Sequence, residues 1–136
     1  MLRIPKRHME QIQRHVRLGF PMEACGMLAG RDSLVTKVYP MINVDKSAYS
    51  YFMDPRDQLR VVRDSRGDGL SLLAIYHSHI ASEAYPSERD RELAFYPDLD
   101  YIIISLANLR RPVMRAFRIR GGEVVEQEFR VVRNGR

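Results

Sequence analysis

The sequence has almost no cysteine, which limits both its covalent chemistry and the compartments that it requires. Cys25 is the only cysteine among 136 residues, so the chain cannot form an internal disulfide and does not depend on an oxidising compartment. We interpret Cys25, which precedes a glycine in a short apolar segment, as a small buried residue rather than a nucleophile or metal ligand.

Long hydrophobic runs are also absent. No apolar stretch approaches the roughly 18 residues that a membrane-spanning helix needs, so we expect no membrane association. The first residues, MLRIPKRHMEQ, lack the apolar core of a signal peptide. Together with the absence of a disulfide, these features predict a cytoplasmic protein.

Lysine is scarce, although the chain is basic. It supplies only three of the 22 basic residues, so the formal net charge of +5 derives mainly from arginine. The arginines are spread along the chain, which is typical of solvated helix and loop surfaces. A basic surface also attracts polyanions. However, no zinc-finger spacing, RNP-like motif or long basic run indicates a nucleic-acid partner, which therefore remains an alternative only.

Two segments have the apolar spacing of amphipathic helices. The first covers residues 4–20, and the second covers residues 53–66 with Asp54 as its N-cap. In the second segment we expect Leu59 and Val62 to face the core, because they lie three residues apart.

The remaining regular segments predict strands. Pro40 places one of them at a sheet edge or breaks it, and Gly121-Gly122 indicates a hairpin between the last two. The pattern predicts an α+β fold (α/β under a looser definition), with two or three helices around a mixed, largely antiparallel sheet. No repeat or change in composition divides residues 1–136, so we expect a single domain. The predicted strands are residues 33–44, 70–77, 101–106, 112–119 and 122–132.

The stretch YHSH, residues 76–79, ends a buried-looking strand in side chains that bind metals. Alternate side chains of a strand share a face, so His77 and His79 point the same way, about 7 Å apart along the strand. Buried imidazoles need partners. A catalytic zinc ion takes about three protein ligands, so the pair predicts a metal site with a third ligand elsewhere in the chain.

Asp90 is the best candidate for this third ligand. Ser87 and Asp90 have the spacing of a helix start with a serine cap, and taken alone this spacing predicts only a cap. A short connection from the histidine strand to such a helix would nevertheless return Asp90 to the histidines. Glu83, Glu88 and Asp98 are weaker candidates, because no pattern fixes their positions.

The other two histidines predict nothing of this kind. His8 and His15 lie seven residues apart in the first helical segment, among arginine and glutamine. We therefore expect both to be plain surface residues.

Together these residues resemble the JAMM metalloprotease family, and the resemblance extends over essentially the whole chain. The family pattern is a glutamate, then histidine–serine/threonine–histidine, then serine and aspartate three residues apart. One position departs, since Ile80 follows the second histidine where members usually carry proline; this touches no ligand but bears on the shape of the next loop. The positions that match are Glu23, His77, Ser78, His79, Ser87 and Asp90.

The resemblance implies a zinc-dependent peptidase. His77, His79 and Asp90 would bind Zn²⁺, with water as the fourth ligand. Glu23 would accept the proton of that water and pass it to the leaving amine, and Ser87 would hydrogen-bond the oxyanion. The implied fold is a curved β-sheet flanked by helices, of the JAMM and cytidine-deaminase type.

Small prokaryotic members of the family look like processing enzymes that cut after the C-terminal Gly-Gly of ubiquitin-like or sulfur-carrier proteins. Such a protein is therefore the expected partner. Two other hypotheses stay open: a catalytically silent scaffold of the same fold, and a basic module that binds nucleic acid. The sequence does not indicate an oligomeric state, the identity of the carrier protein, or whether the bond is an isopeptide or a linear peptide bond.

Overall fold

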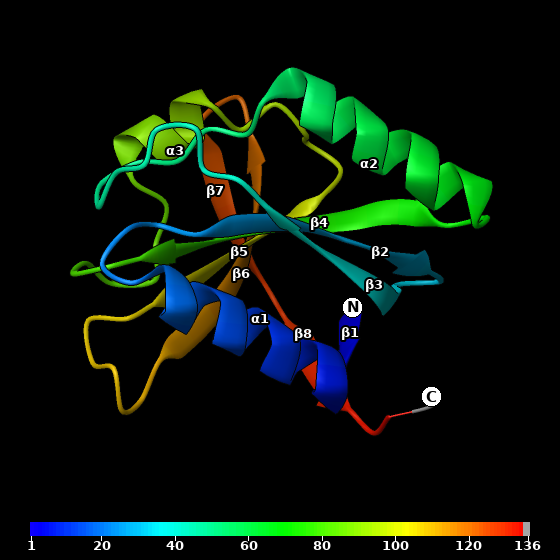
Figure 1. Ribbon diagram of the computed structural model, residues 1–136, viewed down its shortest axis with the longest axis horizontal. Helices are drawn as coiled ribbons and strands as arrows, with labels where there is room; N and C mark the ends of the chain where they lie inside the picture. Colours follow the sequence, from blue (N-terminus) through cyan, green and yellow to red (C-terminus); the bar gives the residue numbers. More distant parts are fainter. Residues whose placement is uncertain (135–136) are drawn as a thin grey trace.

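A computed structural model describes residues 1–134 of the chain, with one eight-stranded mixed sheet and three helices in this range (Figure 1). The α+β class with a curved sheet is confirmed. The elements are β1 Leu2–Pro5, α1 Lys6–Gly19, β2 Cys25–Arg31, β3 Leu34–Met41, α2 Pro55–Gly67, β4 Ser71–His79, α3 Glu88–Glu92, β5 Asp100–Ser105, β6 Val113–Arg120, β7 Glu123–Gln127 and β8 Phe129–Val132.

The strand order is β7-β6-β5-β4-β2-β3-β1-β8, which places β4 near the centre of the sheet. β4 pairs antiparallel with β2 and parallel with β5. In this register Cys25 lies opposite His77, so the start of β2 is beside the end of β4. Glu23, two residues before the start of β2, is thereby brought to the histidines across more than fifty residues of sequence.

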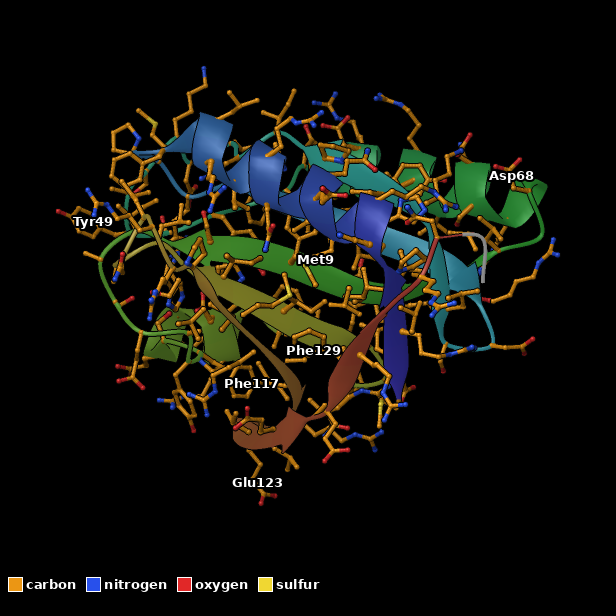
Figure 2. All side chains as sticks on the ribbon, turned by 90° about the horizontal axis from the view of Figure 1, so that it is seen from below. Met9, Tyr49, Asp68, Phe117, Glu123 and Phe129 are labelled. Atoms are coloured by element: carbon orange, nitrogen blue, oxygen red, sulfur yellow. The ribbon has the colours of Figure 1, made fainter. Side chains whose placement is uncertain are left out.

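Two hydrophobic layers hold the sheet between the helices. α1 covers one face, whereas α2 and α3 lie over the other (Figure 1). The α1 layer includes Met9 of α1, Leu28 of β2 and Phe129 of β8 (Figure 2). The opposite layer, which we call the site layer, combines Val61 of α2 with buried side chains of β2, β4, β5 and β6.

Strand alternation in β4 decides which side chains reach the site. Tyr76 belongs to the α1 layer, whereas Ile75 belongs to the site layer, and each is at most 2% exposed. A slip of one residue would carry both histidines to the other face and place Tyr76 and Ser78 at the site. Because full burial of a large apolar side chain contributes about 1.5–3 kcal/mol, the packing of Tyr76 and Ile75 stabilises the register that presents the histidines.

The predicted ends of several elements need correction. Residues 4 and 5, predicted as the start of the first helix, belong to β1, because β1 pairs in parallel with β8, a contact that local spacing does not reveal. The final predicted strand, residues 122–132, is divided into β7 and β8 at Glu128. The hairpin at Gly121-Gly122 is confirmed, with φ angles of +57° and +84°.

Pro40 lies within β3, and the outer side of β3 pairs with β1 only at Leu34. β3 therefore continues through Pro40. Proline has no amide hydrogen to donate, and the described residues provide no strand on the outer side of β3 at this position. The edge position predicted from Pro40 is confirmed for this half of β3.

The buried face of α2 differs from the predicted one. Val61 and Ser65 are buried, whereas Leu59 is 48% exposed and Val62 is only partly buried. The helix contacts the site layer through a narrow stripe that contains a serine. For this reason an apolar pattern alone pointed to the wrong face. No helix among the described residues is long and apolar enough to cross a membrane.

His8 and His15 are not surface histidines, so that prediction was wrong. His8 is only 9% exposed, and His15 Nδ1 lies 2.7 Å from the hydroxyl oxygen of Tyr76. Tyr76 can lie flat against β2 because Gly26 has no side chain; a Cβ there would lie 2.2 Å from the tyrosine ring. The buried hydroxyl needs a partner, and α1 supplies His15.

Candidate metal centre

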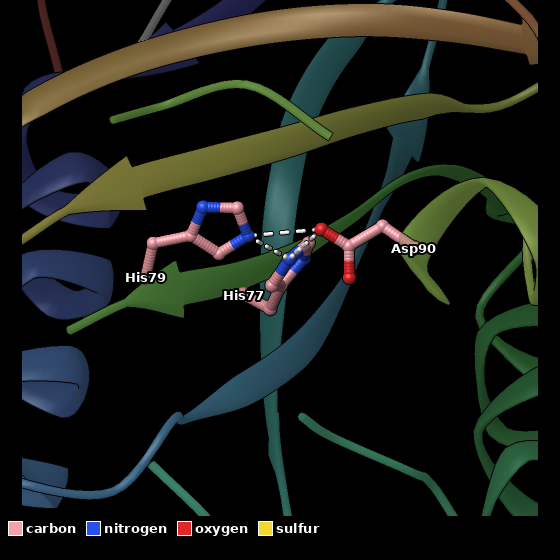
Figure 3. Close-up of side chains that lie close together, drawn as sticks. All are labelled: His77, His79 and Asp90. Carbon is pink, nitrogen blue, oxygen red and sulfur yellow. Dashed lines mark hydrogen bonds and ion pairs between the residues drawn. The ribbon is translucent and has the colours of Figure 1, made fainter. Parts of the chain in front are cut away.

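Three of the predicted site residues converge on one point. The Nε2 atoms of His77 and His79 are 3.2 Å apart, and Asp90 Oδ2 lies 3.1 Å from the first and 2.9 Å from the second (Figure 3). The three side chains are at most 9% exposed. The side chains that the sequence identified as candidate ligands therefore form one compact, buried group.

The start of α3 holds the carboxylate in this group. Ser87 Oγ accepts a hydrogen bond from the Asp90 amide at 3.0 Å, and Asp90 Oδ2 accepts one from the Ser87 amide at 2.9 Å. This is a complete capping box. The cap and the convergence on the histidines are therefore one arrangement, in which the same carboxylate oxygen serves both.

The second nitrogen of His79 fixes the protonation of its ring. Nδ1 lies 2.9 Å from the Glu83 carbonyl oxygen and 3.0 Å from Ser82 Oγ. A carbonyl can only accept, so Nδ1 of a neutral ring carries the hydrogen and Nε2 presents its lone pair to the site. Glu83 thus contributes through its backbone, while its carboxylate is on an exposed residue.

The ring of His77 is held differently. Its Nδ1 is buried and has no hydrogen-bond partner among the described residues. Instead, the ring of Tyr51 stacks on it, with centroids 4.3 Å apart and planes at 27°. Sequence reasoning missed Tyr51, because it lies in the irregular segment between β3 and α2, where no periodicity indicates which side chains turn inward.

The pKa shifts of the three side chains differ in direction, because burial and their mutual hydrogen bonds compete. Burial alone would raise the pKa of Asp90, but hydrogen bonds with His77 and His79 outweigh it and lower this pKa well below its usual range. Burial lowers the pKa of His77. Burial also acts to lower the pKa of His79, yet its hydrogen bonds with Asp90 and the Glu83 carbonyl raise that pKa above its ordinary value.

The donor set fits a divalent metal ion. Two imidazole nitrogens and a carboxylate oxygen are ligands that transition metals accept, and zinc above all in three-ligand catalytic sites. A tetrahedral ion with bonds of about 2.0–2.1 Å keeps neighbouring ligand atoms about 3.3 Å apart. The separations of 2.9–3.2 Å in this chain are close to that value.

Glu23 lies at the same end of β4. It is 6% exposed, and its Oε1 is buried with no hydrogen-bond partner among the described residues. Burial raises the pKa of the Glu23 carboxyl to about 8, with His79 opposing the rise and Asp90 and Asp45 adding to it. A bound cation would act in the opposite direction and stabilise the carboxylate.

The other predicted residues are placed as follows. Ser87 is exposed, and the hydrogen bond that its oxygen accepts from Asp90 leaves the hydroxyl hydrogen free for another acceptor. Glu88 is exposed, and Asp98 pairs with Arg120 at 2.9 Å, so neither belongs to the converging group. Cys25 is fully buried, as predicted.

Ile80, at the position where proline is usual in the resembled family, packs against the α1 layer. The loop after it is fastened by Ser105, whose hydroxyl donates to the Ser82 carbonyl at 2.6 Å. The exit from β4 is therefore held by packing and a hydrogen bond, which replace the restriction that a proline ring would impose.

A family match agrees with this geometry. Residues 5–120 match the family described as prokaryotic homologs of the JAB domain. The chain belongs to this prokaryotic JAB family. The match includes Glu23 and the elements β4 and α3, which carry His77, His79 and Asp90. The resemblance to JAMM proteins is thereby confirmed.

Two relatives are similar to this chain over most of their length. The CysO-cysteine peptidase of Mycobacterium tuberculosis is 39% identical over 120 residues, covering 87% of this chain and 82% of that protein. The probable TtuB-protein conjugate cleaving protease of Thermus thermophilus is 36% identical over 111 residues, covering 81% and 74%.

Solved structures show the same prokaryotic JAB fold. A solution structure of a Desulfitobacterium hafniense protein superposes with a TM-score of 0.90 at 42% identity, covering 98% of this chain and 94% of that one. A structure described as a JAMM metalloprotease-like zinc site in the proteasome and signalosome has a TM-score of 0.60 at 18% identity, covering 95% and 97%. At this identity the second likeness shows the fold alone.

Proposed function

We propose that this chain is a zinc-dependent peptidase that hydrolyses the amide bond following the C-terminal Gly-Gly of a ubiquitin-like or sulfur-carrier protein. The observation that carries the proposal is the convergence of His77, His79 and Asp90 beside the buried carboxyl of Glu23. The two relatives support the substrate class, since one acts on a CysO-cysteine compound and the other on TtuB–protein conjugates.

His77, His79 and Asp90 would hold the zinc ion through two nitrogens and one carboxylate oxygen. When bound, the ion supplies a Lewis acid that polarises the scissile carbonyl and makes water more acidic. The protein contributes a preformed geometry: the Ser87 amide and the Glu83 carbonyl each fix one ligand, and stacking on Tyr51 fixes a third.

Glu23 moves the proton. Its carboxyl takes a proton from the attacking water and later delivers it to the leaving amine, so that each turnover restores the carboxylate. Burial raises the pKa of this carboxyl to about 8, and a bound cation would lower it again, so the two effects together favour a carboxylate that accepts and releases a proton near neutral pH. The unpartnered Oε1 is available for a hydrogen bond to water or substrate.

Ser87 stabilises the charge that develops on the carbonyl oxygen. Its hydroxyl hydrogen is free to donate, because the hydroxyl oxygen accepts from the Asp90 amide. The cap orients this hydroxyl before the reaction begins, so little reorganisation is needed in the transition state.

The Gly-Gly tail is implied by the family resemblance, and the burial of the site residues is compatible with it. A carbonyl can approach such an enclosed group only if the adjoining side chains are small, and glycine has none. A cytoplasmic location is part of the proposal. It is supported by the single cysteine, whose thiol is buried and has its pKa raised by burial to about 12.

The direct test is cleavage by the purified, zinc-loaded full chain. The substrate is a sulfur-carrier protein whose terminal glycine is joined to cysteine, with a lysine-linked conjugate in parallel and release followed by mass spectrometry. We expect the native chain and the control Asp98→Ala to cleave, and Asp90→Ala to be inactive. Absence of cleavage of both substrates by the zinc-loaded native chain would overturn the proposal and favour a silent scaffold.

A further inference from the structure

The backbone amides and carbonyls of Glu23 and Ala24 are all hydrogen-bonded. The Glu23 amide donates to the Ser47 carbonyl at 2.8 Å, and Asn43 Nδ2 donates to the Glu23 carbonyl at 3.0 Å. The Ala24 amide donates to Ser78 Oγ at 2.9 Å, and the Ser78 amide donates to the Ala24 carbonyl at 3.0 Å. Only two side chains, those of Asn43 and Ser78, take part in this clamp.

The Glu23 carboxyl itself is held much less firmly. Its Oε1 has no hydrogen-bond partner among the described residues, although the atom is buried. The direction in which the carboxyl points therefore depends on the backbone clamp rather than on bonds of its own. Any group that shifts this backbone shifts the carboxyl as well.

Asn43 uses both ends of its amide. Its Oδ1 accepts from the Asp45 and Phe52 amides, each at 3.0 Å, while its Nδ2 donates at 3.0 Å both to the Ser50 carbonyl and to the Glu23 carbonyl. One side chain thus closes the segment between β3 and α2, residues 42–54, and joins that closed segment to Glu23.

The same segment also contacts His77 and α3, which carries Asp90; we call His77, His79 and Asp90 together the metal group. Tyr51 stacks on the ring of His77. Asp45 Oδ2 lies 3.4 Å from a guanidinium nitrogen of Arg89, which adjoins Asp90 in α3. Residues 42–54 therefore contact Glu23, β4 and α3. Asn43 holds this segment together through its side-chain hydrogen bonds.

From this arrangement we infer that Asn43 is a positioning residue for the reaction. Its Nδ2 donates to the Glu23 carbonyl and aligns the Glu23 carboxyl with the metal group, without touching substrate or metal. The inference rests on the proposed peptidase function. Ser78 lies between His77 and His79 in β4, so a substitution there would disturb the ligands too, whereas Asn43 lies outside the metal group and can be tested separately.

Asn43→Asp is the sharpest variant, because it keeps the size of the side chain and the acceptor for the segment's amides but removes the Nδ2 donor to the Glu23 and Ser50 carbonyls. We expect kcat to fall about 10- to 100-fold, the scale of a small misplacement of a reacting group, with KM changed less than about threefold. Zinc content should remain about one per chain. Asn108→Asp is the matched control, since Asn108 also accepts a hydrogen bond from a backbone amide, that of Arg110, in an exposed turn, and does not belong to the group of His77, His79 and Asp90.

Asn43→Ser removes the whole amide, both the Nδ2 donor and the Oδ1 acceptor, without adding a charge. A comparable fall in kcat in both variants separates loss of the donor from a charge effect. It also provides a second test if Asn43→Asp does not fold, as judged by thermal unfolding. Native kcat in a folded, zinc-containing Asn43→Ser chain would overturn the inference.

A double-mutant comparison with Glu23→Gln tests whether Asn43 acts through Glu23. If it does, adding Asn43→Asp to Glu23→Gln should leave the residual single-turnover rate unchanged within about twofold, because residues that act as a unit are not additive. A full additional 10- to 100-fold loss would contradict the inference. Failure of the native chain to cleave either conjugate would instead refute the proposed function, so the two failures are distinguishable.

Discussion

Ser87 and Asp90 bind each other at the start of α3, and the shared carboxylate oxygen lies 2.9 Å from His79 Nε2. The carboxylate that completes the helix cap is thus the same one that we propose as a metal ligand. The arrangement places the Ser87 hydroxyl beside the metal group with its oxygen already engaged and its hydrogen free. Removing only the hydroxyl of Ser87 deletes the proposed oxyanion donor and leaves the Asp90 carboxylate in place, so the roles of the two residues can be tested separately.

Ser87→Ala should therefore reduce activity far more than stability. Loss of a cap costs about 1 kcal/mol in the free energy of unfolding, whereas loss of an oxyanion donor reduces kcat about 10²- to 10³-fold. Zinc binding should persist, because the Ser87 amide still donates to Asp90. Denaturant unfolding, metal analysis and cleavage rates measure the three quantities, and a native kcat would exclude Ser87 as the oxyanion donor.

Asp90→Asn should abolish tight zinc binding and the stabilisation that zinc provides. A ligand at about 100 times its Kd stabilises the folded state by about 2.7 kcal/mol, so added zinc should raise the Tm of the native chain after chelator treatment. Asparagine retains the size of the side chain but not the charge that draws the cation. The control Asp98→Asn should show the native shift in Tm, and an equal shift in Asp90→Asn would contradict the ligand assignment.

Much of the site could be predicted from the sequence, because its parts are local patterns. Period-two alternation put His77 and His79 on one face, and the cap spacing put Asp90 at a helix start. The family pattern, rather than local physics, added Glu23. The approach of Glu23 to the histidines depends on the antiparallel register of β2 with β4. The register between two distant strands cannot be predicted from the sequence of either strand alone.

Other parts of the site could not be predicted, because they depend on irregular or long-range packing. Tyr51 and Asn43 lie in a segment without regular structure, where one asparagine side chain replaces the hydrogen bonds of a strand or helix. The contact of the partly buried His15 with Tyr76 depends on Gly26, which makes space for Tyr76 in a different strand. Each requires contacts between residues far apart in sequence, which periodicity does not report.

The His15–Tyr76 hydrogen bond leads to a prediction about stability and pH. Burial lowers the pKa of His15 in the folded chain, so the unfolded chain binds a proton more readily and folding is favoured while the ring is neutral. This contribution is present above about pH 6.5 and is lost as the pH falls through the folded-state pKa. His15→Gln keeps a partner for Tyr76 but cannot titrate, so its unfolding free energy should fall less between about pH 7 and 5 than that of the native chain.

Removing the partner altogether tests the hydrogen bond itself. His15→Ala leaves the Tyr76 hydroxyl buried and unsatisfied, which should cost about 1–3 kcal/mol in the free energy of unfolding at neutral pH. In a Tyr76→Phe background the hydroxyl is gone, so the same substitution should cost less. Equal costs in both backgrounds, measured by denaturant unfolding, would show that the hydrogen bond does not stabilise the fold.

The buried face of α2 can be tested with one substitution on each side of the helix. Val61→Ala removes two methyl groups from the site layer and should reduce the free energy of unfolding by about 1–3 kcal/mol. Leu59→Lys places a charge on a side chain that is already 48% exposed, and should change stability by no more than about 0.5 kcal/mol. A large loss for Leu59→Lys together with a small one for Val61→Ala would show that α2 is rotated towards the face that its apolar spacing suggested.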